Sequence, residues 1–291
     1  TLTYFDSLPI PEADVPWDAD TDVVFTSANY HTYVSASYGP TFSTVAGRSA
    51  VAERMVGLIE DAKISILLAS THLRLRPVAE AILAKASTEP HVEIRVLLDG
   101  QEYTSEWRQA EQGQKLVSCL ESANGDKGEV QKCYDVGYRF ARELHLAGIP
   151  TRFKWNAFRW HYLYALQMHH KYMLIDDEVL ATGSYNLSDN AEHNTFENLV
   201  ILTGDGYPTL ITAFRENFEH LWELGRAEGL APSLLSTITS GQGPVPLIFE
   251  PMAVTTYEIA VLKDAIREAC PLVHDPAFYA HPEDHEVCVP E

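Results

Sequence analysis

Apolar runs of strand length alternate with segments of helical spacing along the first third of the chain. Lys63–Ser70 is almost continuously apolar, as is typical of a strand buried on both faces. In Arg48–Ala62 the apolar residues fall three and four positions apart, which predicts an amphipathic helix. The predicted order is strand, helix, strand, helix, strand, over residues 22–27, 48–62, 63–70, 77–86 and 92–98. This alternation indicates an α/β fold.

The pattern changes beyond residue 103. Residues 104–133 are polar and contain glycine, so we expect a helix and a loop inserted at the margin of the sheet. Further along, Lys171–Ile175 and Val179–Thr182 alternate as strands around a tight turn at residues 176–178. Helices are also predicted at 134–147, 207–224 and 255–269, and strands at 151–154, 198–202 and 246–249. Together these elements predict a mixed, largely parallel central sheet flanked by helices.

Composition divides the chain into three parts. Residues 1–22 are acidic, contain proline and lack periodicity, which predicts an extended arm. Residues 23–225 hold the periodic segments and form the predicted folded domain. Gly, Ser and Pro are frequent from residue 226 onward, and residues 226–291 are interpreted as a C-terminal extension. No apolar run approaches the ~20 residues that a helix needs to cross a bilayer.

Charge is unevenly distributed. The formal net charge is −20, from 41 acidic and 21 basic residues. This balance weighs against a sequence-independent nucleic-acid binder, which usually carries a basic surface. Residues 144–175, however, contain no acid and hold Arg152, Lys154, Arg159, Lys171 and four histidines. A locally positive segment inside an acidic protein is what an anionic substrate requires.

The four cysteines form two local pairs. Cys119 and Cys133 are 14 residues apart, and Cys270 and Cys288 are 18 apart. We interpret them as two disulfides of a secreted or periplasmic protein; the alternative is four unrelated thiols in a cytosolic one. The chain begins at Thr1, as after removal of a signal peptide, although a trimmed chain begins in the same way.

One polar constellation carries the chemistry, in residues 168–202. On a strand, His169 and Lys171 project to the same side and His170 to the other. We therefore interpret His170 as a packing histidine or as one that supports the catalytic residues, rather than as a catalyst. An imidazole beside a fixed cation can attack phosphorus while the cation neutralises the phosphate. Ser184 and Asn186 follow Gly183, again two apart, and offer neutral donors to the same oxygens.

Glu197 opens the next predicted strand. It is placed to accept the proton on the far ring nitrogen of His169, which fixes the tautomer and raises the nucleophilicity of the ring. Asp176 lies seven positions after His169, and this odd offset points it away from the phosphate. We therefore expect Asp176 to support the strand turn or an interface rather than to touch substrate.

At these residues the chain resembles the phospholipase D superfamily, whose signature is HxKxxxxD followed by GSxN. The matching residues are His169, Lys171, Asp176, Gly183, Ser184 and Asn186, with Glu197 where that family has its histidine-orienting acid. The coarse resemblance covers residues 23–225. A second candidate motif, His72-Leu73-Arg74, has Ala79 where the Asp belongs and no following GSxN, so we reject it as a second copy.

The resemblance implies a two-step mechanism without a metal or cofactor. His169 attacks phosphorus to give a phosphohistidine, a second histidine protonates the leaving alcohol, and water or another alcohol releases the enzyme. Because this chain has one motif where the family places two around each site, the second histidine is expected to be His169 of another subunit in a two-fold homodimer. Whether water or an alcohol accepts the phosphoryl group is left open.

Three functions compete. Hydrolysis of phospholipid headgroups is favoured, because the net charge disfavours polyanions and an aromatic loop at 155–166 could touch a membrane with Trp155, Phe158 and Trp160. The same loop could equally be core packing. A DNA or RNA nuclease is the alternative, and a non-catalytic interaction module is the third.

A polar loop with His281, Glu283, Asp284 and His285 is interpreted as part of a disulfide loop rather than as a metal site.

Overall fold

The computed structural model describes residues 20–45, 47–104, 106–134, 137–154 and 167–224, with a few isolated positions between 236 and 268. Several predictions made from the sequence therefore lie outside the described residues. These are most of the N-terminal arm, Trp155, Phe158, Trp160, the Cys270–Cys288 pair, the loop around His281 and nearly all of the C-terminal extension.

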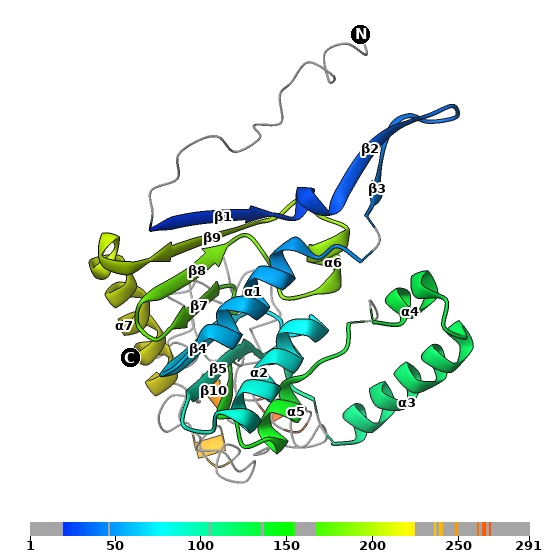
Figure 1. Ribbon diagram of the computed structural model, residues 1–291. Helices are drawn as coiled ribbons and strands as arrows, with labels where there is room; N and C mark the ends of the chain where they lie inside the picture. Colours follow the sequence, from blue (N-terminus) through cyan, green and yellow to red (C-terminus); the bar gives the residue numbers. More distant parts are fainter. Residues whose placement is uncertain are drawn as a thin grey trace.

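The centre of the domain is a mixed sheet (Figure 1). In the described part of the chain it has eight strands in the order β1-β9-β8-β7-β4-β5-β6-β10. Their bounds are β1 Thr21–Phe25, β4 Ser65–Ser70, β5 Glu93–Asp99, β6 Thr151–Lys154, β7 Lys171–Ile175, β8 Val179–Gly183, β9 Asn198–Thr203 and β10 Ile248–Phe249. The helices are α1 Ala50–Asp61, α2 Arg76–Thr88, α3 Glu106–Ala123, α4 Lys127–Tyr134, α5 Ala141–Leu146, α6 Asp189–His193 and α7 Pro208–Leu224.

The predicted α/β fold with a mixed sheet is confirmed, but the sheet is less parallel than expected. Within the described residues, parallel pairing is confined to β4 with β5 and β5 with β6. The reason lies in the connections. Asp176 and Asp177 both have positive φ, 56° and 59°, and Glu178 N donates to Ile175 O at 3.0 Å, which closes a tight hairpin turn over residues 176–178. A connection this short can join only antiparallel strands, because a parallel pair needs a long crossover connection.

Strand alternation divides the core into two layers. Met173 and Ile175 of β7 pack with α1 and α2 on one face, together with Leu68 of β4. Tyr172 and Leu174 face the opposite layer, which α7 covers with Ile211, Phe218 and Trp222 (Figure 1). Because successive strand residues point to opposite faces, this assignment fixes the direction of every side chain along the motif strand.

Two features depart from the predicted elements. The Gly/Ser/Thr-rich stretch before α1 forms an antiparallel hairpin of β2 (Tyr30–Ser35) and β3 (Gly39–Thr44), preceded by a 3-10 turn at Thr26–Asn29. The helix predicted at 134–147 is short, because α4 ends at Tyr134 and α5 begins at Ala141. Between them, Gly137 has a φ of 70°, and Tyr138 and Phe140 are both buried in the core.

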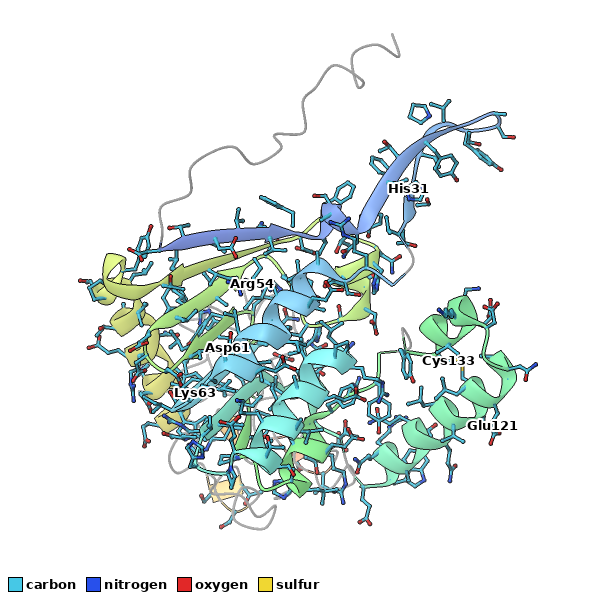
Figure 2. All side chains as sticks on the ribbon, in the orientation of Figure 1. His31, Arg54, Asp61, Lys63, Glu121 and Cys133 are labelled. Atoms are coloured by element: carbon cyan, nitrogen blue, oxygen red, sulfur yellow. A yellow bond between two sulfur atoms is a disulfide. The ribbon has the colours of Figure 1, made fainter. Side chains whose placement is uncertain are left out.

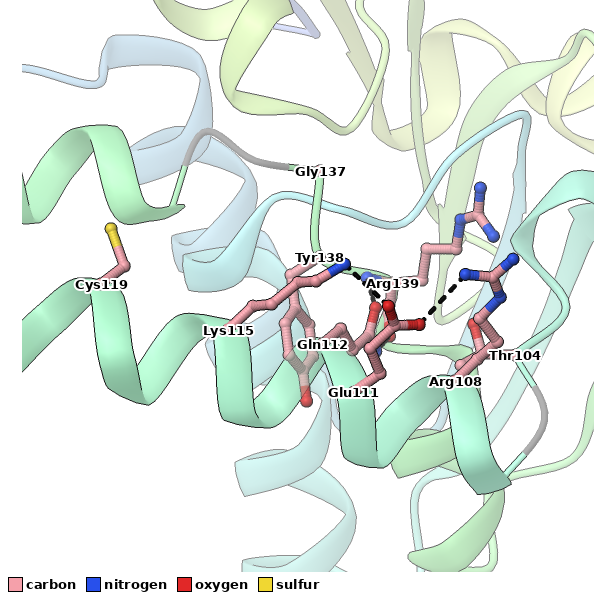
Figure 3. A pocket seen from close by; sticks show the side chains of 9 residues that line it. All are labelled: Thr104, Arg108, Glu111, Gln112, Lys115, Cys119, Gly137, Tyr138 and Arg139. Carbon is pink, nitrogen blue, oxygen red and sulfur yellow. Dashed lines mark hydrogen bonds and ion pairs between the residues drawn. The ribbon is translucent and has the colours of Figure 1, made fainter.

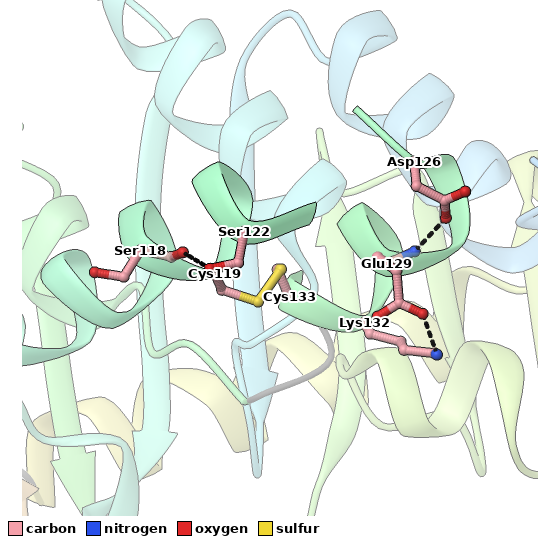
Figure 4. Close-up of a disulfide and its surroundings, with 7 residues drawn as sticks. All are labelled: Ser118, Cys119, Ser122, Asp126, Glu129, Lys132 and Cys133. Carbon is pink, nitrogen blue, oxygen red and sulfur yellow. Dashed lines mark hydrogen bonds and ion pairs between the residues drawn. A yellow bond between two sulfur atoms is a disulfide. The ribbon is translucent and has the colours of Figure 1, made fainter. Parts of the chain in front are cut away.

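Helices α3 and α4 form an arm beside the sheet. Figure 2 shows Glu121 and Cys133 on this arm, apart from the main body. The predicted Cys119–Cys133 disulfide joins the two helices, with the Cα atoms 5.6 Å apart (Figure 4). This cross-link holds a segment that buries little apolar surface of its own, since Ala123 is the one core residue of α3. No helix among the described residues is long and apolar enough to cross a membrane.

Candidate active site

The motif residues gather at the end of the sheet where β4 ends, here called the motif end. Lys171 pairs with Ser70, the last residue of β4, so β7 begins there. Antiparallel pairing of β8 with β7 and of β9 with β8 brings Gly183 and Asn198 to the same end. Three chain segments separated in sequence therefore meet around His169.

Strand parity distinguishes the two neighbouring histidines. Lys171 lies on the same face of β7 as Met173 and Ile175, which is the face that α1 and α2 cover. By alternation, His169 points to that face as well. His170 points to the α7 layer, where its ring centroid lies 5.5 Å from that of Tyr172. Partial burial lowers the pKa of His170, and Lys154, Lys171 and His169 add to this effect. The two histidines are both exposed, but His170 has a ring partner in Tyr172, whereas His169 lies beside Lys171 at the motif end.

Lys171 lies directly beside the ring of His169. Its Nζ is 3.3 Å from Nδ1, 3.4 Å from Nε2 and 3.2 Å from the backbone oxygen of His169. Desolvation lowers the pKa of the Lys171 ammonium, and the nearby Glu197 carboxylate opposes that shift. An anion that contacts the His169 ring would therefore meet a fixed positive charge at hydrogen-bond distance.

Ser184 and Glu197 form one hydrogen-bonded unit. Ser184 Oγ donates to Glu197 Oε2 at 2.5 Å and accepts from the backbone and side chain of Asn198 at 3.2 and 3.3 Å. The other Glu197 oxygen accepts from Thr195 Oγ1 at 2.9 Å, and Thr26 Oγ1 accepts from Glu197 N at 2.7 Å. The carboxylate is thus held from two sides before any substrate arrives.

The structure does not show the expected bond between Glu197 and His169. Both residues are described, and the Glu197 carboxylate uses Ser184 and Thr195 as partners instead. The role of Glu197 as the acid that orients His169 stays a prediction. Its electrostatic effect on Lys171 nevertheless places it at the same site.

Asn186 keeps its hydrogen-bonding capacity. Its Oδ1 is buried and has no partner among the described residues, although buried polar atoms are nearly always paired. The neighbouring Tyr185 is tied down: its hydroxyl donates to Glu192, a fully buried carboxylate that also accepts from Asn29 Nδ2 at 2.6 Å and from Ala52 N at 3.1 Å. Tyr185 therefore anchors the loop beside the unpaired Oδ1 of Asn186.

Asp176 lies at the far end of β7 from His169, at the strand turn that it was expected to support. Its Oδ1 accepts from the backbone N–H groups of Ile64 and Ser65 at 2.7 Å, and its Oδ2 from that of Lys63 at 2.8 Å. Burial alone would raise the pKa of this carboxyl, but the three backbone donors outweigh burial and lower it. Asp176 thus fastens the β7–β8 turn to the start of β4.

Replacing Asp176 with Asn should lower the free energy of unfolding by about 1–3 kcal/mol, because one carboxylate oxygen becomes an NH₂ group facing a donor. The unfolded carboxyl protonates near 3.8 and the folded one at lower pH. Its contribution is therefore present above about pH 4 and lost as pH falls through the folded pKa. Urea unfolding between pH 3 and 7, at roughly half-unit steps, should show that slope in the wild type and a weaker slope in the variant.

Asp177 provides the matched control. It occupies the adjacent turn position, also with positive φ, but its carboxylate pairs with Arg215 at an exposed surface. Asp177→Asn should cost no more than about 1 kcal/mol. Equal losses in the two variants would show that the three backbone donors do not make Asp176 special.

A buried ion cluster at the motif end was not predicted. Glu102 is 0% exposed and accepts from His72 Nδ1 at 3.0 Å and from Arg74 Nη2 at 2.6 Å. Desolvation pushes the pKa of Glu102 up, yet the bonds from His72 and Arg74 lower it below its ordinary value. The rejected second motif is therefore used for structure. Its signal in the sequence was an acid directly after a buried parallel strand, where functional side chains gather in α/β sheets.

Asp99 is a second residue that the sequence analysis did not single out. It ends β5 and is buried, and its Oδ2 accepts from the backbone N–H of Met168 at 2.8 Å. Lys154, at the end of β6, donates to Gln167 O at 3.0 Å. These two bonds fix the chain immediately before His169, so the ends of the parallel strands set the position of His169.

A separate cavity of about 340 Å³ lies between α3 and residues 137–139 (Figure 3). Glu111 accepts there from Arg108 at 3.1 Å and from Lys115 at 2.8 Å, so these charges are already paired. No motif residue lines this cavity. Among the described residues there is also no group of His, Cys, Asp and Glu arranged to hold a metal ion.

Comparison with known families identifies the domain. A family model described as "Cardiolipin synthase, PLD-like domain" matches residues 55–222, more than half of the chain and all of the motif. The chain belongs to the PLD-like domain family. The matched span runs from within α1 to near the end of α7, and so includes both layers of this PLD-like domain.

Curated relatives of the PLD-like domain match over short segments. The human protein named mitochondrial cardiolipin hydrolase is 45% identical over 56 residues, which is 19% of this chain and 21% of the human one. The protein of that name from Danio rerio is 36% identical over 80 residues, 28% of this chain and 31% of its own. The matches therefore span about a fifth to a third of the length of these relatives.

Solved structures were also compared. Nuc from Salmonella typhimurium, a phospholipase D family member, has a TM-score of 0.44 and 18% sequence identity, and the match covers 71% of this chain and 97% of Nuc. NucT from Helicobacter pylori has a TM-score of 0.40 and 16% identity, with 70% of this chain and 97% of NucT covered. Family membership rests on the family model.

Proposed function

We propose that this PLD-like domain is a metal-independent phosphodiesterase that acts through a phosphohistidine at His169, with phospholipids as substrates. The contact between Lys171 Nζ and both ring nitrogens of His169 carries the proposal, because it places a nucleophile and a phosphate-binding cation at one point. A ring nitrogen attacks phosphorus, an N–P bond forms, and the P–O bond to the leaving alcohol breaks. Water then attacks phosphorus, the N–P bond breaks, and the phosphomonoester leaves.

Charge stabilisation in this mechanism comes from side chains already at the site. Lys171 neutralises one non-bridging oxygen, and the side-chain NH₂ group of Asn186 donates to a second. Ser184 contributes its hydroxyl once the bond to Glu197 rearranges. These groups supply the positive potential that a metal ion would otherwise provide, so we expect no cofactor requirement.

The leaving alcohol needs a proton from a second histidine. The in-chain candidate His72 has its Nδ1 against the buried Glu102 within a structural cluster. We therefore propose that His169 of a second subunit supplies the proton, and that the working enzyme is a two-fold homodimer. Alternating roles of the two rings then complete one catalytic cycle.

Phospholipid is the proposed substrate class for two reasons. The relatives that match this chain are named mitochondrial cardiolipin hydrolase, and a net charge of −20 disfavours long polyanions. Nucleic acid is the second candidate, which the acid-free segment at residues 144–175 favours. The Cys119–Cys133 disulfide supports a secreted or periplasmic location as part of the proposal.

One assay separates the two substrate classes. Purified protein is incubated in EDTA with phosphatidylcholine, with cardiolipin and with single-stranded DNA, in parallel. Release of headgroup or of phosphatidic acid from the lipids, with intact DNA, is the expected result. Cleavage of DNA without lipid turnover would reverse the order of the two candidates, and loss of all activity in EDTA would contradict the metal-independent mechanism.

A further inference from the structure

The β2–β3 hairpin stands out from the body of the domain (Figure 1). Its strands pair only with each other among the described residues, in a register from Tyr30 opposite Thr44 to Ser35 opposite Gly39. Figure 2 shows His31 on this projection, away from α1 and the sheet. A two-stranded ribbon of this kind has no hydrophobic core of its own, so its exposed side chains are informative.

One face of the hairpin and its tip are apolar and exposed. Val34 and Phe42 lie on the same face by strand alternation and are 71% and 59% exposed. Phe196 packs edge-on against Phe42, with ring centroids 5.5 Å apart, and is itself 63% exposed. Tyr38, in the connecting turn, is 86% exposed. A contiguous exposed apolar patch of this kind marks an interaction surface.

The hairpin carries no formal charge. Residues 23–47 contain no Asp, Glu, Lys or Arg, although the chain has 62 such residues in total. The one histidine of the ribbon, His31, has its Nε2 at 2.8 Å from Ser43 Oγ. Insertion of this segment into a less polar medium therefore desolvates no ion, which would otherwise be the largest cost.

The root of the hairpin is attached to the motif end of the sheet. Phe196, part of the apolar patch, directly precedes Glu197. Thr26, in the turn before β2, accepts from Glu197 N at 2.7 Å and donates to Thr195 O at 2.8 Å. Any external surface that contacts the hairpin is therefore close to the site that contains Lys171 and Ser184.

We propose that the tip and apolar face of the β2–β3 hairpin insert into the interfacial region of a phospholipid bilayer and hold the catalytic end against it. The proposal deepens the proposed function, on which it rests, by naming the element that meets the lipid surface. Tyrosine at an exposed tip suits the headgroup region, where the ring is buried and the hydroxyl stays wet. Complementary charges often orient a protein partner, and this ribbon offers none.

The charge of the whole molecule makes the lipid preference specific. A protein with a net charge of −20 is repelled by an anionic bilayer, and the uncharged hairpin adds no attraction to offset this. Binding to zwitterionic phosphatidylcholine vesicles should therefore exceed binding to phosphatidylserine-containing vesicles at low salt. Added salt should narrow the difference.

Vesicle flotation tests the proposal with the full chain and phosphatidylcholine vesicles. Tyr38→Ser removes the tip without touching a packed contact, and Val34→Ser with Phe42→Ser removes the apolar face. We expect at least a tenfold loss of vesicle partitioning in the double variant Val34→Ser/Phe42→Ser. The loss in Tyr38→Ser should be smaller. The matched control is Trp107→Ser on α3, an aromatic residue that is 66% exposed elsewhere and whose loss should leave partitioning unchanged.

Two further readouts separate the possible outcomes. Thermal unfolding checks that the variants fold, and light scattering gives their oligomeric state. The proposal is overturned if Tyr38→Ser and the folded double variant Val34→Ser/Phe42→Ser both partition like the wild type. It is also overturned if the wild type does not bind vesicles. A loss of dimers with unchanged vesicle binding would assign the hairpin to a subunit interface instead. Vesicle binding without phosphodiester turnover would refute the proposed function and leave the hairpin proposal standing.

Discussion

Replacing His169 with Asn is expected to reduce phosphodiester turnover by at least about three orders of magnitude, to the background of the assay. Asparagine is close to imidazole in size but cannot attack phosphorus, so no covalent intermediate forms. Lys171 would remain at the site, and substrate binding should persist because the proposed phosphate contact is made by its ammonium. The measurement is headgroup release under saturating substrate, together with binding of a non-hydrolysed analogue.

His170→Asn is the matched control for that variant. The two histidines are adjacent in sequence, but His170 faces Tyr172 and the α7 layer. Its replacement should leave turnover within about threefold of the wild type. If His170→Asn abolished turnover and His169→Asn did not, the assignment of the nucleophile from strand parity would be wrong.

Mixed dimers extend this prediction to the subunit arrangement. If both rings of a dimer are needed for one catalytic cycle, heterodimers of wild-type and His169→Asn subunits are inactive. Activity after random reassembly should then fall as the square of the wild-type fraction. A linear decline, or full activity in a monomer identified by light scattering, would contradict the shared site.

Gly183→Ala should be the most damaging small substitution in the domain. A Cβ at Gly183 would lie 2.3 Å from the backbone oxygen of Asn198 and 2.8 Å from its Oδ1. The obstructing atom is backbone of β9, so the strands must separate, at a cost of about 3 kcal/mol or more. Because Asn198 also binds Ser184, the shift would move Ser184 and Glu197 as well. Urea unfolding and turnover should therefore both fall.

Gly57→Ala tests whether this loss is specific to the position. Gly57 lies within α1, and a Cβ there would meet nothing within 4 Å. Alanine in the interior of a helix should stabilise the domain by about 0.5–1 kcal/mol. If Gly183→Ala unfolded at the same urea concentration as the wild type, the close approach of β8 and β9 would not be needed for folding.

Most of the motif end could be predicted from the sequence, because the patterns that indicate it are local. Alternation along β7 depends on neighbouring residues alone, so it separated His169 from His170 and placed Asp176 at the distant turn. The strands and helices around α1, α2 and β4–β6 followed from periodicity within single segments. Such patterns survive folding because each element buries the face that its own spacing defines.

The features that were missed depend on contacts between distant segments. Glu102 is one acid among 41 in the sequence, and its importance appears when β4 and β5 bring it to His72 and Arg74. The β2–β3 ribbon contains Tyr, Thr, Val and Phe, which favour strands, but no strand was predicted in this stretch. The bond of Glu197 to Ser184 depends on the register of β8 and β9, which periodicity does not specify.

Trapping the covalent intermediate tests the central claim most directly. Protein is mixed with phosphorus-labelled substrate, quenched in alkali within the first turnover and digested, and the label is located by mass spectrometry. We predict an acid-labile, base-stable phosphoryl adduct on His169 that is missing in His169→Asn and unaffected by EDTA. Turnover by the wild type with no label on His169, or with the label on another residue, would contradict the proposed mechanism.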